Sequence, residues 1–160
     1  MSTTQDIHTM RCMEVWGGND AVDRGVAMPG LELWVRSEPL PGHTEGGDVH
    51  FVSSCGTGRI SRMVVADVSG HGDGASSLAQ GLRRLMRRFV NFVDQTRFVR
   101  ALNDAIFSPT SGDFATSLTM TFFAPTRHLT LCNAGHPRPM FWSASTREWR
   151  VLAARQASAR

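Results

Sequence analysis

The 160-residue sequence contains no lysine, because all 17 of its basic residues are arginines. Arginine suits the recognition of phosphate and of bases, and the net charge of +3 raises the question of a nucleic-acid partner. The interleaved basic and aromatic residues of an RNA-recognition sheet are missing, however. Complete replacement of lysine by arginine is better explained by the base composition of a genome, so we expect no nucleic-acid partner.

Cysteines are few, and long apolar runs are absent. The three cysteines, Cys12, Cys55 and Cys132, form no Cys-x-x-Cys pair, which argues against a disulfide framework and a zinc knuckle. No apolar run is long enough to span a bilayer, and no apolar segment of a signal peptide follows the polar amino terminus. We therefore expect one cytoplasmic domain over residues 1–160 without a membrane partner, with residues 1–9 flexible.

The most informative stretch covers residues 63–74, where an apolar, β-branched run ends at Asp67 and a glycine-dense turn follows. After the turn, residues 75–93 carry apolar side chains at helical spacing. The pattern predicts a strand, an acidic tip, a tight loop and a helix. Such a unit exposes one carboxylate beside several backbone amides, which suits a metal or a phosphate, although many glycine loops are only turns.

A second aspartate precedes a neighbouring strand. Gly46-Gly47-Asp48 lies before an apolar run at residues 49–52, and a turn at residues 55–58 separates this run from residues 60–66. An antiparallel hairpin of these two strands would place Asp48 and Asp67 at the same end. Two converging carboxylates repel each other unless a divalent cation lies between them, and oxygen ligands favour magnesium or manganese over zinc.

Three segments in order carry a family resemblance: residues 46–48, residues 66–72 (Ala-Asp-Val-Ser-Gly-His-Gly) and residues 133–137 (Asn-Ala-Gly-His-Pro). Leu102-Asn103 and residues 114–116 are secondary matches. The sequence resembles the bacterial branch of the metal-dependent type 2C serine/threonine protein phosphatases (PPM family), which includes the stage II sporulation protein E phosphatase domain. The resemblance covers roughly residues 31–142.

The resemblance implies an α+β fold, an α-β-β-α sandwich with two mostly antiparallel sheets. It also implies that Asp48, Asp67 and the backbone carbonyl of Val68 bind the metal in a two-metal Mn²⁺ or Mg²⁺ site. The activity implied is hydrolysis of phosphoserine or phosphothreonine by a metal-activated water. The expected partner is a phosphorylated signalling protein, of the anti-sigma-factor-antagonist type.

Two histidines are candidates for catalysis. His71 could protonate the leaving oxygen, but the eukaryotic members of the family carry their histidine at the position of Ser69. The alternative is that His71 orients the loop or sits at the helix start. His136, in the loop of residues 133–137, is a second candidate, with a structural or solvated role as its alternative.

The carboxyl-terminal part departs from the family pattern, because residues 144–160 contain no Thr-Asp-Gly motif to supply the remaining metal ligands. The sandwich is therefore expected to be incomplete there, and the chain is either a fragment or a natural truncation. The alternative function is a catalytically impaired homologue that binds a partner protein without turnover. Four arginines lie off the apolar stripe of the predicted helix, namely Arg83, Arg84, Arg87 and Arg88. They form either a docking patch for a partner or a solvated face of the helix.

The remaining elements follow from periodicity and turn residues. Residues 20–29 are expected to form a loop, and Thr96 is expected to cap a second helix that ends near Phe107. Strands are predicted over residues 31–37, 114–123, 129–132, 138–142 and 149–153.

Overall fold

The structure is a computed structural model that describes residues 7–106 and 112–152. Three sequence predictions lie partly outside these residues: the flexible amino terminus up to residue 6, the end of the second helix near Phe107, and the last residue of the strand over residues 149–153.

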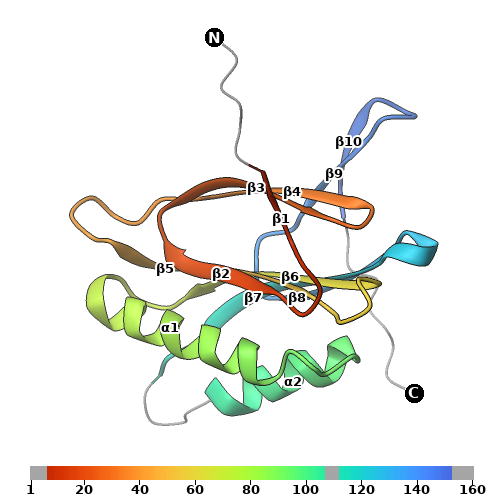
Figure 1. Cartoon of the computed structure of the whole chain (residues 1–160). Coiled ribbons are helices and arrows are strands. Elements are labelled where there is room, and N and C mark those ends of the chain that lie inside the picture. The colour runs from red at the N-terminus through yellow and green to blue at the C-terminus, as the bar shows by residue number, and fades with distance from the viewer. Residues whose placement is uncertain (1–6, 107–111, 153–160) are drawn as a thin grey trace, which may run out of the picture.

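The central element is a five-stranded antiparallel sheet (Figure 1). Its strands, in spatial order, are β2 (Val15–Asp20), β5 (Glu45–Ser54), β6 (Ile60–Val68), β7 (Ala115–Phe123) and β8 (His128–Ala134). The predicted hairpin of β5 and β6 is present, and so is the hairpin of β7 and β8, which turns through the short 3-10 helix η1 (Ala124–Thr126).

A second sheet consists of β1 (Ile7–Thr9), β3 (Val22–Met28) and β4 (Leu31–Ser37), in the order β1-β3-β4. The prediction of a loop over residues 20–29 is wrong, because most of this segment is β3. Gly25 lies under the Trp34 ring, where an added Cβ would lie only 2.8 Å from the ring. Residues 7–9 pair with β3 as a parallel strand and are therefore not the flexible segment expected from their polarity.

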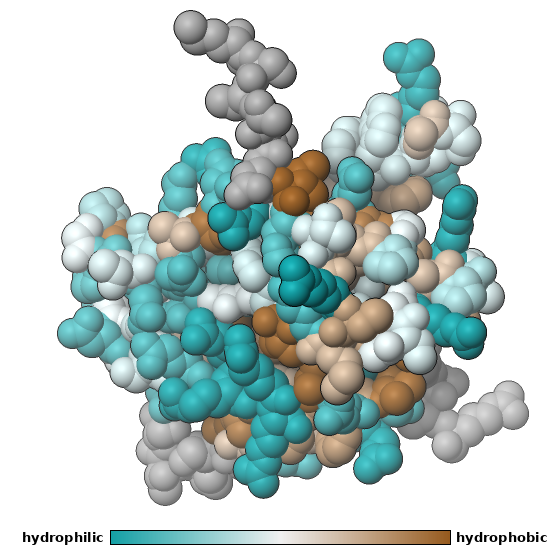
Figure 2. Space-filling model, in the orientation of Figure 1, coloured by the Kyte–Doolittle hydropathy of each residue, from teal (hydrophilic) through white to brown (hydrophobic). Residues whose placement is uncertain are grey.

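Two helices, α1 (Gly72–Arg88) and α2 (Gln95–Ile106), cover one face of the five-stranded sheet (Figure 1). The apolar side chains of both helices pack against β5 and β6, and the buried members include Phe51, Val64, Met86 and Phe98. The outer surface over α1 is hydrophilic (Figure 2). Asp94, and not Thr96, caps α2, because its Oδ1 accepts a hydrogen bond of 2.7 Å from the backbone N–H of Arg97.

The other face of the five-stranded sheet packs against the second sheet through a smaller core that contains Val26, Met28, Val52, Met63 and Phe122. The architecture is therefore α+β with two sheets. Within the described residues both helices lie on one side, so the chain shows an α-β-β arrangement without a second helical layer. No described helix is long and apolar enough to cross a membrane.

The β-hairpin of β9 (Met140–Ser143) and β10 (Glu148–Val151) projects away from both sheets (Figure 1). Trp142 and Trp149 pair across it, with ring centroids 5.4 Å apart, and both side chains are exposed. The sequence predicted both strands.

Candidate metal centre at the ends of strands β5 and β6

Asp48 and Asp67 are direct cross-strand partners in the β5–β6 ladder. Paired residues of an antiparallel ladder point to the same face, with Cβ atoms about 4.5 to 5.5 Å apart. Both side chains are exposed to solvent. The hairpin therefore brings the two predicted carboxylates together at one end of the sheet, where their charges repel in the absence of a cation.

Both carboxylates line an open cleft with a volume of about 270 Å³. Gly47 lines the same cleft and leaves room beside the third predicted ligand, since a Cβ added to it would lie 3.3 Å from the carbonyl oxygen of Val68. Val68 itself is buried, so its backbone is held firmly by the core under α1. A side chain at position 47 would crowd this carbonyl.

The loop between β6 and α1 forms one wall of the cleft through Gly70, His71 and Gly72. Gly70 and Gly72 have φ angles of 92° and 69°, a region that favours glycine. His71 precedes the helix in an extended conformation, makes no side-chain capping bond and is exposed. His71 therefore sits at the helix start, as the alternative to a catalytic role expects, and its side chain also lines the cleft.

Sequence reasoning missed two groups that line this cleft, His43 and Glu45. Nδ1 of His43 lies 4.0 Å from Oδ1 of Asp73 in the first turn of α1. Neither residue stands in a motif that points to chemistry. The only signal for Glu45 is its place directly before Gly46-Gly47-Asp48.

Glu45 joins the start of β5 to α1. Its Oε2 accepts hydrogen bonds from Oγ of Ser76, at 2.8 Å, and from Nε2 of Gln80, at 2.5 Å. These two bonds are the main reason why the pKa of Glu45 lies below its ordinary value. Asn19 extends the network, because its amide donates to the carbonyl of Gly46 at 3.1 Å. The network fixes the segment that carries Asp48.

His136 lies one strand further along the sheet. Thr116 pairs directly with Asp67 in the β6–β7 ladder, and its Oγ1 lies 2.9 Å from Nδ1 of His136. Asn133 holds the loop, since its Oδ1 accepts from the backbone N–H of His136 and its amide donates to the carbonyl of the same residue. Asp48, Asp67, Thr116 and His136 thus form a polar row across the sheet. His136 is outside the lining of the cleft that holds both aspartates, and it faces a groove between the sheets that Asp48 also lines.

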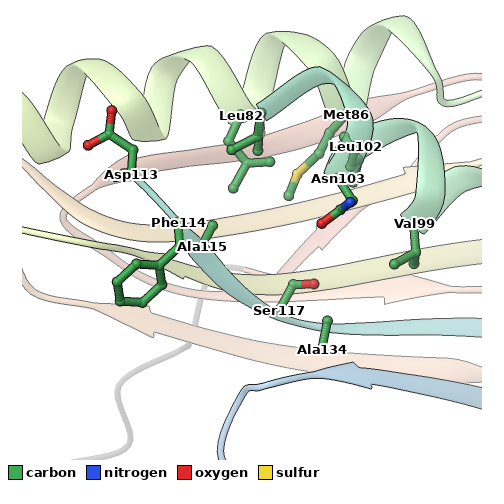
Figure 3. A pocket seen from close by; sticks show the side chains of 11 residues that line it. Leu82, Met86, Val99, Leu102, Asn103, Asp113, Phe114, Ala115, Ser117 and Ala134 are labelled. Carbon is green, nitrogen blue, oxygen red and sulfur yellow. The ribbon is translucent and has the colours of Figure 1, made fainter. Parts of the chain in front are cut away.

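Leu102 and Asn103, which match the family pattern, lie away from the cleft with the two aspartates. Both side chains line a cavity of about 140 Å³ between the helices and β7, with Leu82, Met86 and Val99 as further apolar lining (Figure 3). Asn103 and Ser117 contribute polar atoms to it from opposite walls. This cavity is on the helical side of the sheet, whereas Thr116 and the aspartate pair point to the other side.

The donor atoms at the cleft are of the type that hard divalent cations prefer. Two carboxylates and one carbonyl are oxygen donors, and Mg²⁺ is commonly bound by one or two carboxylates together with waters and phosphate oxygens. The described parts of the chain contain no group of three or more histidine, cysteine, aspartate or glutamate side chains that could hold a metal ion. The described residues thus offer three proposed oxygen ligands at this cleft, fewer than such an ion needs to fill its coordination shell.

Comparisons with known proteins find a matching family. A family model described as Stage II sporulation protein E (SpoIIE) matches residues 57–158, which is more than half of the chain. The match includes Asp67 and residues 133–137, while Asp48 precedes it. A comparison with functionally curated proteins finds no significant match.

Among solved structures, the chain is similar to the crystal structure of the RsbU and RsbW domains of Rv1364c from Mycobacterium tuberculosis. The TM-score is 0.63 and the sequence identity is 23%. The similar region covers 71% of this chain but only 32% of that one, so this chain spans about a third of its length. At this identity the similarity establishes a common fold.

Proposed function

The chain belongs to the stage II sporulation protein E family of PPM-type phosphatases, and we propose that it hydrolyses phosphoserine or phosphothreonine on a signalling protein with the help of Mn²⁺ or Mg²⁺. The observation that carries this proposal is the direct pairing of Asp48 with Asp67 at a solvent-open cleft. A phosphate group has access to this cleft, and the glycine loop beside it provides backbone N–H groups at the start of α1.

Asp48, Asp67 and the carbonyl of Val68 would hold the cation. When bound, it supplies Lewis-acid stabilisation of the phosphoryl oxygens and lowers the pKa of a water molecule. The chain itself keeps two carboxylates side by side on rigid strands. Glu45 and its hydrogen bonds to α1 fix the segment that leads to Asp48, and Gly47 leaves space for the Val68 carbonyl.

His71 is proposed as the proton donor to the leaving serine or threonine oxygen, since its imidazole is exposed at the cleft. General acid catalysis contributes about 10² to 10⁴-fold to a rate. His43 lines the same cleft and is the competing donor. His136, which contacts Thr116 beside Asp67, is proposed to position that strand end rather than to transfer a proton.

We propose a phosphorylated regulatory protein in the cytoplasm as the substrate, of the anti-sigma-factor-antagonist type. The similar Mycobacterium tuberculosis structure contains an RsbU and an RsbW domain of one protein, which supports a regulatory setting. This substrate is inferred from the family to which the chain belongs and not from the shape of the cleft.

A second candidate function is binding of a phosphoprotein without turnover. It is supported by the small number of ligands, because two carboxylates are the only acidic or histidine ligands proposed among the described residues. Binding would then use the same cleft, but no phosphate would be released.

Phosphate release from a phosphothreonine peptide tests the two candidates. The purified chain is assayed with manganese, with chelator and as the Asp67→Asn variant, with Asp104→Asn on the exposed side of α2 as the matched control. We expect metal-dependent release that chelation and Asp67→Asn abolish and Asp104→Asn preserves. Absence of release by the folded wild-type chain at saturating manganese would refute the hydrolase and favour binding without turnover.

A further inference from the structure

At the junction of the two helices, two stacked phenylalanine rings lie between two arginine side chains. The guanidinium of Arg88 lies 5.7 Å from the ring centroid of Phe89, and Phe89 stacks on Phe92 with centroids 5.5 Å apart. The guanidinium of Arg97 lies 5.0 Å from the Phe92 centroid. We call these four residues the arginine–phenylalanine ladder. Both arginines are exposed and both phenylalanines are partly buried, so the rings support cations that face solvent.

Positive charge is concentrated around this ladder. Residues 83–106 contain six arginines and two aspartates, a local charge of +4, whereas the whole chain carries +3. The rest of the chain is therefore slightly acidic. Arg84, Arg87 and Arg100 are exposed on the same two helices. Such an asymmetry between parts of a small domain indicates an electrostatic surface and not a uniformly basic protein.

Helix stability does not explain the arrangement. Arg87 and Arg88 lie in the last turn of α1, where a cation is favourable, but Arg97 lies in the first turn of α2, where the helix dipole disfavours one. Within residues 7–106 and 112–152 no ion pair joins either ladder arginine to a carboxylate. The nearby Asp94 carboxylate accepts a hydrogen bond from the backbone N–H of Arg97.

We propose that the arginine–phenylalanine ladder is a docking surface for an acidic, glutamate- or aspartate-rich segment of a partner protein. A guanidinium stacked on a ring has lost rotational freedom and presents its planar N–H edge, which bonds a carboxylate in bidentate fashion. Two such edges beside three further exposed arginines match a short run of carboxylates. The patch occupies one helix junction, whereas binding of duplex DNA needs cations spread along many phosphates.

This surface is separate from the aspartate pair. The cleft lies at the amino end of α1 and the ladder at its carboxyl end, and a helix of 17 residues spans about 25 Å. The proposal requires only the folded helical layer, so it holds whether or not the chain hydrolyses phosphate. A partner bound at the ladder leaves the cleft accessible.

Fluorescence anisotropy with the full chain tests the proposal. The probe is a fluorescein-labelled octapeptide that alternates glutamate with serine, and its counterpart carries glutamine for glutamate. We compare wild type with Arg88→Gln/Arg97→Gln, with Arg88→Lys/Arg97→Lys and with a control, Arg59→Gln/Arg150→Gln. The control removes the same charge from exposed positions outside the helices. Asp67→Asn separates the measurement from the metal cleft.

At 50 mM salt we expect the acidic peptide, but not the glutamine peptide, to bind. The glutamine double variant should bind about tenfold or more weakly and the lysine double variant roughly threefold or more weakly, because lysine keeps the charge but loses the planar fork. The control and Asp67→Asn should bind as wild type does. Equal losses in the control and the ladder variants would overturn the proposal, as would no binding of the acidic peptide. If a 20-base-pair DNA duplex binds more tightly than the peptide and its binding depends on the same arginines, the partner is nucleic acid and the proposal of an acidic protein is overturned.

Discussion

Replacing Asp67 with asparagine should stabilise the protein in chelator, even though the same change removes a proposed metal ligand. Asp48 and Asp67 are direct cross-strand partners and both are exposed. Two unit charges about 5 Å apart repel by roughly 0.8 kcal/mol in water and by about 3 kcal/mol at an effective dielectric constant of 20. Because solvent reaches both groups, the smaller value applies. We therefore expect a gain of about 0.5 to 1 kcal/mol in the free energy of unfolding, or about 1 to 4 °C in Tm.

Manganese should reverse this order. At about 100 times its Kd, a ligand that binds only the folded state adds roughly 2.7 kcal/mol, and this gain should be confined to proteins with the intact pair. Thermal unfolding followed by circular dichroism, in chelator and in manganese, measures both effects. The control Asp104→Asn should shift with manganese as wild type does. The reasoning is refuted if Asp67→Asn is less stable than wild type in chelator, or if manganese stabilises both equally.

Three further predictions concern groups outside the aspartate pair. Arg62 is buried, and its guanidinium donates hydrogen bonds to backbone carbonyls in the link between α1 and α2. Arg62→Ala should therefore lower the free energy of unfolding, measured in urea, by about 2 to 4 kcal/mol. Arg59 is exposed, and Arg59→Ala should change this free energy by less than about 0.5 kcal/mol. The hydrogen bonds that lower the pKa of Glu45 stabilise the fold when its carboxyl is ionised, so Glu45→Gln should lower the urea midpoint at pH 7. The difference in urea midpoint between wild type and the variant should disappear as the pH falls below about 4.5. A difference that grows in acid would contradict the hydrogen-bond account. Partial burial raises the pKa of the Cys55 thiol, but hydrogen bonds from the Thr57 side chain and from the backbone of the turn outweigh this effect and bring the pKa to about 7. The rate at which iodoacetamide alkylates Cys55, measured by mass spectrometry, should therefore rise with pH with a midpoint near pH 7. A midpoint above about pH 8 would refute this prediction.

The sequence was enough to predict the hairpin that brings Asp48 and Asp67 together. The β-branched run before Asp67, the short turn and the matching run after Asp48 all follow from local chemistry, and the hairpin that they predict has both aspartates in register. Local signals of this kind also predicted α1 and the hairpins of the second half. The family model matches residues 57–158, a range that contains Asp67 but not Asp48.

The failures share a physical cause, which is that the deciding contact is distant in sequence. β3 was predicted as a loop, yet it is a strand in which Gly25 makes room for the Trp34 ring of the neighbouring strand. The contact of Thr116 with His136 depends on a loop twenty residues later.

The α2 cap was misplaced for a different reason. Asp94 and Thr96 are both good capping residues two positions apart, and composition alone does not choose between them. The hydrogen bond from the backbone N–H of Arg97 decides in favour of Asp94.

The central claim is that the aspartate pair is a divalent-cation site, and manganese binding followed by electron paramagnetic resonance tests it most directly. Free aqueous Mn²⁺ gives a sharp signal that falls when protein binds the ion. The account predicts saturable loss of this signal with wild type and with Asp104→Asn, and little loss with Asp48→Asn or Asp67→Asn. Equal binding by wild type and by both pair variants, or no binding by the folded wild-type chain, would contradict it.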